Sequence, residues 1–348
     1  MKIAFTSCMS SNSYQQQQVW DAIGAKNPDF LVLLGDSVYI DCPPQPDNKG
    51  NQHPSDNQYL DNDFAIHLHK LYQNQLAVPQ FKKLITNQNL KTYAIWDDHD
   101  FLWNDADSGD SKNKLHMNQA IISSNLLGCW RDALFQHGNG FPKSTSGNDP
   151  LAYKVWKNYK TPVDLSLYDG FMPGYSHVQL QAGIHLHLTD GRSWRTHNEM
   201  LGSNQRNQIE KVFKQFPDDV HIVASGSTFG KHGSSGWHNC KVDESWMLSM
   251  ASQFRVVMLS GDIHKNVAPA PIQPKQQPGF NFYEFTSSGA GVNFNPLNWS
   301  PIAPINGWLN FSQKFGMLEI TDKVMNIELF DHGIAHLPAS PSISLATW

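Results

Sequence analysis

The chain has 348 residues, a formal net charge of −5 at pH 7, and charged residues at only 16% of its positions. This length is sufficient to bury a large core, and the absence of a basic block argues against binding of nucleic acid through its phosphate backbone. No apolar stretch is long enough to span a bilayer. The cysteines form no C-x-x-C pair, so we expect Cys42, Cys129 and Cys240 to be buried or chemically idle thiols.

Short apolar runs alternate with helical patterns along the first half of the chain, which predicts an α/β fold. The predicted elements are, in order, a strand at 2–7, a helix at 13–26, a strand at 30–34, helices at 64–74 and 79–86, a strand at 93–96 and a helix at 115–137. Between them the sequence predicts a long loop at 41–60, an acidic loop at 97–114 and an irregular segment at 139–180. We expect the irregular segment to cover the functional site.

The same alternation continues through the second half of the chain. The predicted elements are strands at 183–189, 221–224, 255–259, 281–286, 316–320 and 324–329, with helices at 203–216 and 243–253. The later strands are candidates for a second sheet. No internal repeat or linker interrupts the pattern, so we predict a single domain over residues 1–348.

Four apolar runs end next to side chains that bind metals. A short apolar run without alternation is typical of a strand buried on both faces, and the carboxyl ends of such strands meet at one edge of an α/β sheet. The residues that follow the runs are Cys8 after the first, Asp36 and Tyr39 after the second, Asp97, Asp98, His99, Asp100 and Asn104 after the third, and Asp262 and His264 after the fourth. This set predicts a polynuclear metal site and metal-assisted hydrolysis.

Each motif taken alone also has a structural explanation. Asp36 is placed to cap a following helix, and Tyr39 would ordinarily be a packing aromatic. Because a phenol has a pKa near ~10, Tyr39 becomes a ligand only for a strongly acidic cation such as ferric iron. The run 97–100 is compatible with an exposed acidic turn, and an isolated histidine such as His264 is more often structural than a ligand.

Seven motifs occur in the order found in one enzyme family. They are Phe5–Cys8, Leu34–Tyr39, Trp96–Asp100 with Asn104, Asp190–Arg195, Leu201–Gly202 with Gln205, Gly261–His264 and Glu284–Ser288. Over about residues 5–291 the chain resembles the alkaline phosphatase D, or PhoD-like, family of metallophosphoesterases, and 292–348 would form C-terminal strands and a tail. The sequence shows no twin-arginine signal, so we expect the chain, if complete, to be cytoplasmic and a trimmed mature form to be exported.

The resemblance implies a four-layer α-β-β-α sandwich of the calcineurin-like metallophosphoesterase type, with Fe3+ and Ca2+ at the strand ends. The residues that match the family's iron ligands are Cys8, Asp36, Tyr39 and His264, and those that match its calcium ligands are Asp36, Asn104 and Asp262. The amide ligand stays open, because Asp98 lies where related phosphoesterases carry an asparagine.

These expectations predict a metal-dependent phosphoric ester hydrolase, a phosphodiesterase or phosphomonoesterase, in which metal-bound hydroxide attacks phosphorus. We expect His99 to act as general acid or phosphate donor, oriented by Asp100 and next to Asp98. Arg192 is expected to contact the phosphate through two nitrogens, and a structural pair with Asp190 is the alternative.

The expected substrate is a small-molecule or lipid-type phosphate ester, and no protein partner is inferred. The Gly- and Ser-rich segment 225–240 follows a strand and is either an ordinary surface loop or part of the substrate entrance, with the candidate residues Lys231, His232, Trp237 and His238. A competing hypothesis is a metal-stabilised binding protein of the same fold that has lost turnover. The presence of His99 and Asp100 beside the ligands argues against it.

Overall fold

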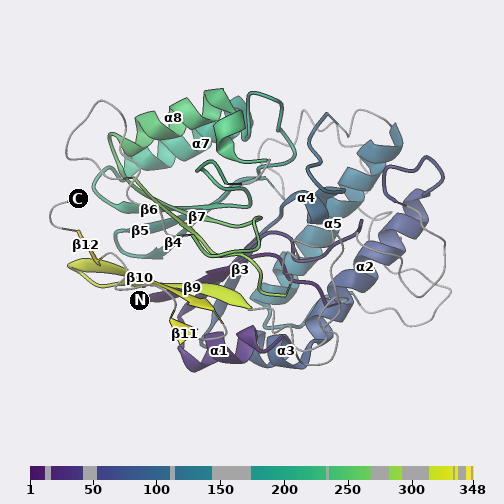
Figure 1. The fold of residues 1–348 in the computed structure, drawn as a ribbon, viewed down its shortest axis with the longest axis horizontal. Coiled ribbons are helices and arrows are strands. Elements are labelled where there is room, and N and C mark those ends of the chain that lie inside the picture. The colour runs from purple at the N-terminus through teal and green to yellow at the C-terminus, as the bar shows by residue number, and fades with distance from the viewer. Residues whose placement is uncertain are drawn as a thin grey trace.

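A computed structural model of the protein describes residues 1–11, 17–41, 53–109, 114–142, 174–232, 235–267, 282–291, 313–331, 334–335, 342–345 and 348. In these ranges two β-sheets lie face to face between two layers of helices (Figure 1). The four-layer α-β-β-α arrangement expected from the sequence is therefore confirmed. Cys42, the rest of the segment 42–52, and residues 143–173 of the predicted cover lie outside the described residues.

The first sheet, sheet A, contains the predicted strands of the N-terminal part. Its members are β1 (Lys2–Thr6), β2 (Phe30–Leu34), β3 (Lys91–Ile95), β9 (Lys314–Ile320), β10 (Val324–Asp331), β11 (Ile334–Ala335) and β12 (Ser342–Ser344). Their order is β11-β10-β9-β1-β2-β3, with β12 paired to β10. Because β1, β2 and β3 are parallel, their carboxyl ends lie at one edge of the sheet.

The second sheet, sheet B, contains β4 (Ser176–Gln181), β5 (Ile184–Leu188), β6 (Val220–Ser225), β7 (Arg255–Ser260) and β8 (Tyr283–Thr286), in that order. Strands β5 to β8 are parallel, and β4 runs antiparallel to β5 at the edge. Strand β4 lies in the segment that we expected to be irregular, because its residues are mostly polar. The last strands, β9 and β10, return to sheet A rather than extending the second sheet.

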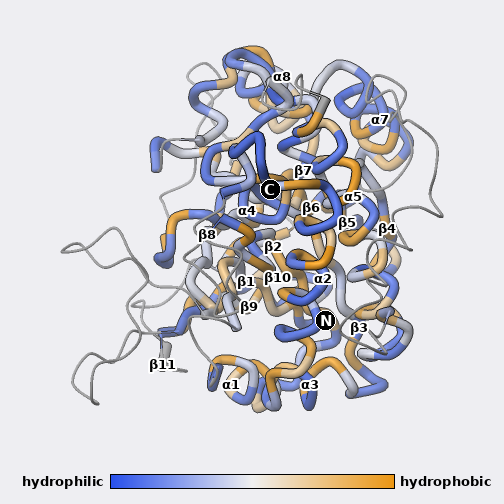
Figure 2. Tube along the Cα trace, turned by 90° about the vertical axis from the view of Figure 1, so that its right-hand side faces the viewer, coloured by the Kyte–Doolittle hydropathy of each residue, from blue (hydrophilic) through white to orange (hydrophobic). Residues whose placement is uncertain are grey.

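Three apolar clusters separate the four layers, and β2 explains the unbroken apolar runs in the sequence. Leu31 and Leu33 pack with the helices outside sheet A, whereas Phe30, Val32 and Leu34 pack between the two sheets. Successive residues of a strand point to opposite faces, so a strand covered on both sides is apolar at every position. Figure 2 shows the apolar strands gathered in the centre of the molecule between more polar helices.

In the described ranges, six helices cover the outer faces of the sheets. Sheet A is covered by α1 (Val19–Ala25), α2 (Asp61–Ala77), α3 (Pro79–Ile85) and α5 (Lys114–Phe135), and sheet B by α7 (Gly202–Gln215) and α8 (Lys241–Ala251). Residues 13–16 of the predicted helix 13–26 lie outside the described residues, and α1 begins at Val19, just after the buried Gln17, whose side chain bonds Trp20 and Gln75. Among the described residues, no helix combines the length and the apolar character needed to cross a membrane.

A chain of hydrogen bonds through two buried histidines lies between sheet B and α7. The Tyr175 hydroxyl lies 2.8 Å from His187 Nδ1, His187 Nε2 lies 3.0 Å from His221 Nδ1, and His221 Nε2 lies 2.9 Å from the Phe216 carbonyl oxygen. A carbonyl only accepts, so His221 Nε2 carries hydrogen and, in a neutral ring, its Nδ1 accepts. The same logic makes His187 Nε2 a donor and its Nδ1 an acceptor. With both rings neutral, each contact of the chain thus joins one donor to one acceptor.

A second, parallel pair of histidines ends at a carboxylate. His177 Nε2 lies 2.9 Å from His185 Nδ1, and His185 Nε2 lies 2.8 Å from Asp219 Oδ2. The imidazoles of His185 and His221 are stacked with centroids 5.3 Å apart, so the two chains are adjacent. Burial lowers the pKa of His187 well below its usual value and lowers that of His221 to about 4. These shifts favour the neutral form of both rings.

Candidate metal centre

Four of the predicted metal ligands have backbone conformations that are unusual for their residue types. The φ angles of Cys8, Asp36, Asp262 and His264 are 59°, 51°, 73° and 54°, in the left-handed region that favours glycine. Cys8, Asp36 and Asp262 come just after the carboxyl ends of β1, β2 and β7, and His264 lies two residues further on. A residue held in this region costs of order 1 kcal/mol or more, and such residues are typical of functional sites.

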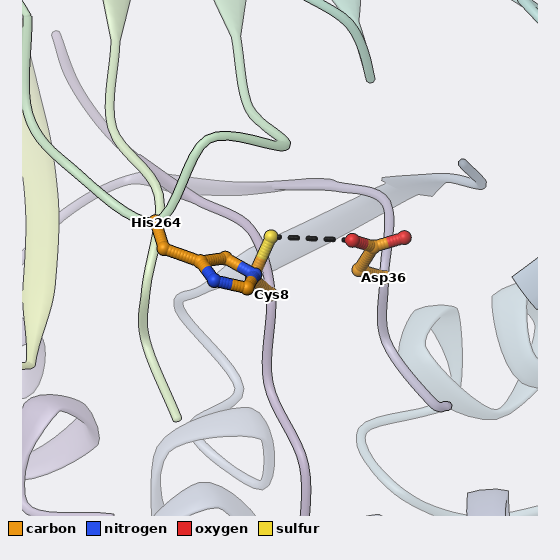
Figure 3. Close-up of side chains that lie close together, drawn as sticks. All are labelled: Cys8, Asp36 and His264. Atoms are coloured by element: carbon orange, nitrogen blue, oxygen red, sulfur yellow. Dashed lines mark hydrogen bonds between the residues drawn. The ribbon is translucent and has the colours of Figure 1, made fainter. Parts of the chain in front are cut away.

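Residues from both sheets converge at the first group of ligand atoms, which contains Cys8, Asp36 and His264 (Figure 3). Cys8 Sγ lies 3.3 Å from Asp36 Oδ2. The Tyr39 hydroxyl lies 3.1 Å from the same carboxylate oxygen and 3.2 Å from His264 Nε2. The structure therefore brings together all four side chains that match the iron ligands of the family.

Two further groups extend this site along the strand ends. One contains Asp36, Asp98 and His99, and the other contains Asp97, Asp98 and Asp262, with the ligand atoms of each group within 4.8 Å of one another. Asp36 belongs to the first and second groups, and Asp98 belongs to the second and third. The three groups are thus linked by shared carboxylates, which is the arrangement needed for neighbouring cations.

Buried carboxylate oxygens that make no hydrogen bond indicate whether cations fit this arrangement. Asp36 Oδ1, Asp97 Oδ2 and Asp98 Oδ1 are buried and have no hydrogen-bond partner among the described residues, although an Arg192 nitrogen lies 3.4 Å from Asp98 Oδ1. A buried carboxylate oxygen without a partner costs about 1–3 kcal/mol or more, so such oxygens are normally paired or bound to a metal. These side chains therefore fit a site for cations.

The electrostatics of the site lead to the same conclusion. Burial raises the pKa of the Cys8 thiol to about 11. Burial and neighbouring negative groups raise the pKa values of Asp36 and Asp262 well above their usual range. Several acidic groups this close together cannot all ionise without added positive charge. A cation would supply that charge and stabilise the thiolate and carboxylate forms.

Asp98 and Asn104 are the two candidates for the ligand position at which the family carries an amide. Asn104 is exposed, and its amide nitrogen donates to Asp105 Oδ2 at 3.1 Å. Asp98 is buried, and its Oδ2 accepts from the Asp105 backbone nitrogen at 2.6 Å. Although burial opposes ionisation, the charges of Arg192 and His99 lower the pKa of Asp98 to about 2. Asp98 is therefore the better placed of the two for a cation.

His99 is oriented by a residue that the sequence did not indicate. Its Nδ1 lies 2.6 Å from Asp41 Oδ1, whereas Asp100, the expected partner, accepts hydrogen bonds from the backbone nitrogens of Ser37, Val38 and Asp97. The expectation that Asp100 orients His99 is therefore wrong. Asp100 instead holds the loop after β2 against the short helix α4 (Asp98–Phe101), whose capping box pairs it with Asp97.

Arg192 is fully buried and cannot present two nitrogens to a substrate in this conformation. Its Nε donates to Asp97 Oδ1 at 2.5 Å, and one terminal nitrogen lies 3.4 Å from Asp98 Oδ1. The terminal nitrogens also donate to Ser227, Ser235 and the Ala106 carbonyl. The alternative pairing with Asp190 involves only the Arg192 backbone nitrogen, at 3.0 Å. Arg192 thus neutralises two carboxylates from behind the site.

The comparison with known proteins decides the family. A family model described as PhoD-like phosphatase matches residues 3–297. The chain belongs to this family. Membership agrees with the resemblance of the motifs and identifies the chain as a phosphoesterase.

The comparisons with solved structures and with curated proteins give no further information about this PhoD-like phosphatase. A predicted phosphoesterase from Streptococcus pneumoniae TIGR4 has 10% identity and a TM-score of 0.32, over 99% of this chain and 97% of that chain. Zinc-complexed Vps29 from Entamoeba histolytica has 9% identity and a TM-score of 0.32, over 99% of both chains. TM-scores this low support no argument about fold or function. A search of curated proteins gave no match.

Three glycines let the strand ends of this PhoD-like phosphatase approach closely. A Cβ on Gly35 would lie 2.7 Å from the Asp97 backbone nitrogen, one on Gly226 would lie 2.5 Å from Asp97 Cγ, and one on Gly261 would lie 2.5 Å from Ser7 Oγ. Contacts this short do not occur with real Cβ atoms. The absence of side chains at these positions therefore places the ends of β2, β6 and β7 around the acidic cluster.

The segment 225–240 contributes less than expected to an entrance. Trp237 is fully buried, and its indole nitrogen donates to Ser225 Oγ at 2.9 Å, so this residue packs in the core beneath the segment. Lys231 is exposed, and His232 and His238 are partly buried. Glu284 accepts hydrogen bonds from the backbone nitrogens of Phe229 and Gly230 and fixes the start of the segment.

Proposed function

We propose that this PhoD-like phosphatase is a metal-dependent phosphoric ester hydrolase that acts on small-molecule or lipid-type phosphodiesters or phosphomonoesters. The observation that carries the proposal is the set of three ligand groups linked through Asp36 and Asp98. Hydrolysis of a phosphate ester requires positive charge near the phosphoryl oxygens, and adjacent cations are a common source of it.

The chemistry of the donors suggests a different ion for each end of the site. Cys8, Tyr39 and His264, with the Asp36 carboxylate, form a mixed sulfur, phenolate and nitrogen set, which suits Fe3+. The group at the other end offers only carboxylates, from Asp97, Asp98 and Asp262, and an all-oxygen set suits Ca2+. The group between them joins Asp36 and Asp98 and also contains His99. We retain Asp36 as the shared ligand and favour Asp98 over Asn104 in the calcium set, because Asp98 is buried and belongs to two of the ligand groups, whereas Asn104 is exposed.

The remaining side chains position and protonate the substrate. Cations bound here would stabilise charge on the phosphoryl oxygens and lower the pKa of the attacking water. Burial alone would lower the pKa of His99, but the carboxylates of Asp41, Asp98 and Asp36 outweigh burial and raise it well above its usual value. With Nδ1 bonded to Asp41, the protonated ring keeps Nε2–H to donate to the leaving oxygen. Arg192 is assigned to hold Asp97 and Asp98 rather than the phosphate.

A first experiment tests the metals. Elemental analysis of the purified protein is expected to find iron, and bound ferric iron is expected to give a visible absorption band from Cys8 or Tyr39. The double variant Cys8→Ser, Tyr39→Phe should lose the band, whereas Cys129→Ser, at a partly buried cysteine of α5, should keep it. A band that persists in the double variant would overturn the iron assignment.

A second experiment tests the chemistry with a chromogenic phosphodiester and a chromogenic phosphomonoester. Asp36→Ala and His264→Ala are expected to lose both metal and activity. His99→Ala is expected to lose about 10²–10⁴-fold in rate while it keeps most of its metal, because a general acid does not hold the cation. A metal-free His99→Ala protein would make His99 a ligand, and a fully metallated wild-type protein without turnover would favour the binding protein.

A further inference from the structure

Two buried serines lie on either side of the Cys8 sulfur. Ser288 Oγ lies 3.1 Å from Cys8 Sγ, and Ser7 Oγ lies 3.4 Å from it. All three side chains are completely buried. Ser7 precedes Cys8 at the end of β1, whereas Ser288 follows β8, so the two hydroxyls reach the sulfur from different sheets.

Each serine also accepts a hydrogen bond from the backbone of a proposed metal ligand. The His264 backbone nitrogen donates to Ser288 Oγ at 2.8 Å, and the Asp262 backbone nitrogen donates to Ser7 Oγ at 3.3 Å. A serine hydroxyl carries one hydrogen, which is then free to point at the sulfur. The result is two short relays, each running from a backbone amide through a hydroxyl to Cys8 Sγ.

The direction of these bonds depends on the charge of the sulfur. As a thiol, Cys8 has one hydrogen, and both Asp36 Oδ2 at 3.3 Å and the Asp262 carbonyl oxygen at 3.5 Å are within its reach. As a thiolate, the sulfur only accepts, and the hydroxyls of Ser7 and Ser288, together with that of Tyr39, can donate to it. The surroundings of Cys8 thus contain hydrogen bonds suited to a negatively charged sulfur.

The backbone nitrogens that donate to the two serines belong to residues in the left-handed conformation. Asp262 and His264, like Cys8, have positive φ angles, so the segment 261–264 needs contacts that hold it in place. Gly261 lies against Ser7, since a Cβ there would lie 2.5 Å from Ser7 Oγ. The serine relays therefore connect the ligands on sheet B to the thiol ligand on sheet A.

We propose that Ser7 and Ser288 are positioning residues of the metal centre, which join the Asp262 and His264 backbone to the Cys8 sulfur and withdraw electron density from that sulfur when it binds a metal. The inference rests on the proposed function, because it assumes that Cys8 is a ligand. Hydrogen bonds to a ligating sulfur and to its neighbours are known to change metal affinity and reduction potential.

The test uses Ser7→Ala and Ser288→Ala, with Ser287→Ala as the matched control. Ser287 is also completely buried, but its hydroxyl donates to Asn266 Oδ1 at 2.7 Å. The metal-free proteins are titrated with Co2+, whose bond to a thiolate gives a near-ultraviolet charge-transfer band. The two test variants should bind Co2+ about 10–100-fold more weakly, with the band at longer wavelength. The control should match the wild type, and equal affinities and band positions in all four proteins would overturn the proposal.

Hydrogen exchange on the metal-free proteins separates this inference from the proposed function. Ser288→Ala removes the acceptor of the His264 amide, and Ser7→Ala removes the acceptor of the Asp262 amide. Amide exchange in 261–264 should therefore accelerate in both variants, whereas it should stay unchanged in Ser287→Ala. If the wild type binds no Co2+, the metal assignment of the proposed function fails. The exchange rates in 261–264 alone then show whether the serine hydroxyls hold this backbone. Unchanged exchange rates in both test variants would overturn the proposed relays.

Discussion

The buried histidine chain makes the stability of sheet B sensitive to acid. In the unfolded chain a histidine takes up a proton near pH 6.5, whereas burial lowers the pKa of His221 in the folded protein to about 4. Between these values the unfolded state binds more protons than the folded state, so the free energy of unfolding falls as the pH falls. The contribution of His221 is fully present above pH 6.5 and is lost as the pH falls towards 4.

The size of this effect follows from the two pKa values. A fall from 6.5 to about 4 corresponds to about 3 kcal/mol, with a slope of at most ~1.4 kcal/mol per pH unit for one proton. His187 Nε2 lies 3.0 Å from His221 Nδ1, and each charge would lower the pKa of the other ring, so the contributions of the two rings are not added.

His221→Gln provides the perturbation, because an amide offers a donor and an acceptor without titrating in this range. His197→Gln, at an exposed histidine, is the matched control. Urea unfolding of the metal-free proteins at pH 7, 6, 5 and 4.5 gives the free energy of unfolding for each. His221→Gln should be destabilised at pH 7, and its deficit relative to the wild type should shrink as the pH falls. A deficit that stays constant from pH 7 to 4.5 would refute the reasoning.

Four further predictions concern the metal centre. Gly226→Ala should lose metal and about 1–3 kcal/mol of stability, because its Cβ would overlap the Asp97 carboxyl, whereas Gly191→Ala, with 3.6 Å to the nearest side-chain atom, should keep its metal. Arg192→Met should cost about 3–5 kcal/mol in urea unfolding, because it leaves buried carboxylates unpaired, and an unchanged midpoint would contradict its assignment. Asp41→Asn should lower the pKa of His99, the proposed general acid, and move the basic limb of the pH–rate profile to lower pH without loss of metal. Chelation of calcium should suppress turnover while the protein stays folded, and added calcium should restore turnover better than added magnesium. Undiminished turnover after verified removal of calcium would leave iron as the only catalytic metal.

The fold and the gathering of Cys8, Asp36, Asp262 and His264 at the strand ends were predictable because they depend on local patterns. The apolar run before Asp36 shows that β2 is covered on both faces, and a strand end places its next residues at the edge of the sheet. Strand β4 was not predictable in this way, because its polar residues lie at an edge and resemble a loop. Helix α4 was missed as well, although the spacing of Asp97 and Asp100 is that of a capping box.

The roles of His99 and Arg192 depend on contacts between distant parts of the chain. His99 and Asp41 are 58 residues apart, and Arg192 and Asp97 are 95 residues apart. No local spacing distinguishes Asp41 from other acidic residues of the loop that begins there. Arg192 follows a strand with Asp190 close by, so the sequence suggests a local pair, and only the packing of the sheets shows that its guanidinium faces Asp97.

The ligands of the candidate metal centre come from both sheets, and this has a consequence for how the molecule opens. Cys8 and Asp262 are 254 residues apart in sequence, and their sheets otherwise meet through the apolar cluster between them. An ion bound at the edge would act as a crosslink that closes a very long loop, and such links remove the most conformational freedom from the unfolded chain. Removal of the ion should therefore loosen the two sheets first at this edge, so that proteases gain access to the strand ends before the helices outside unfold.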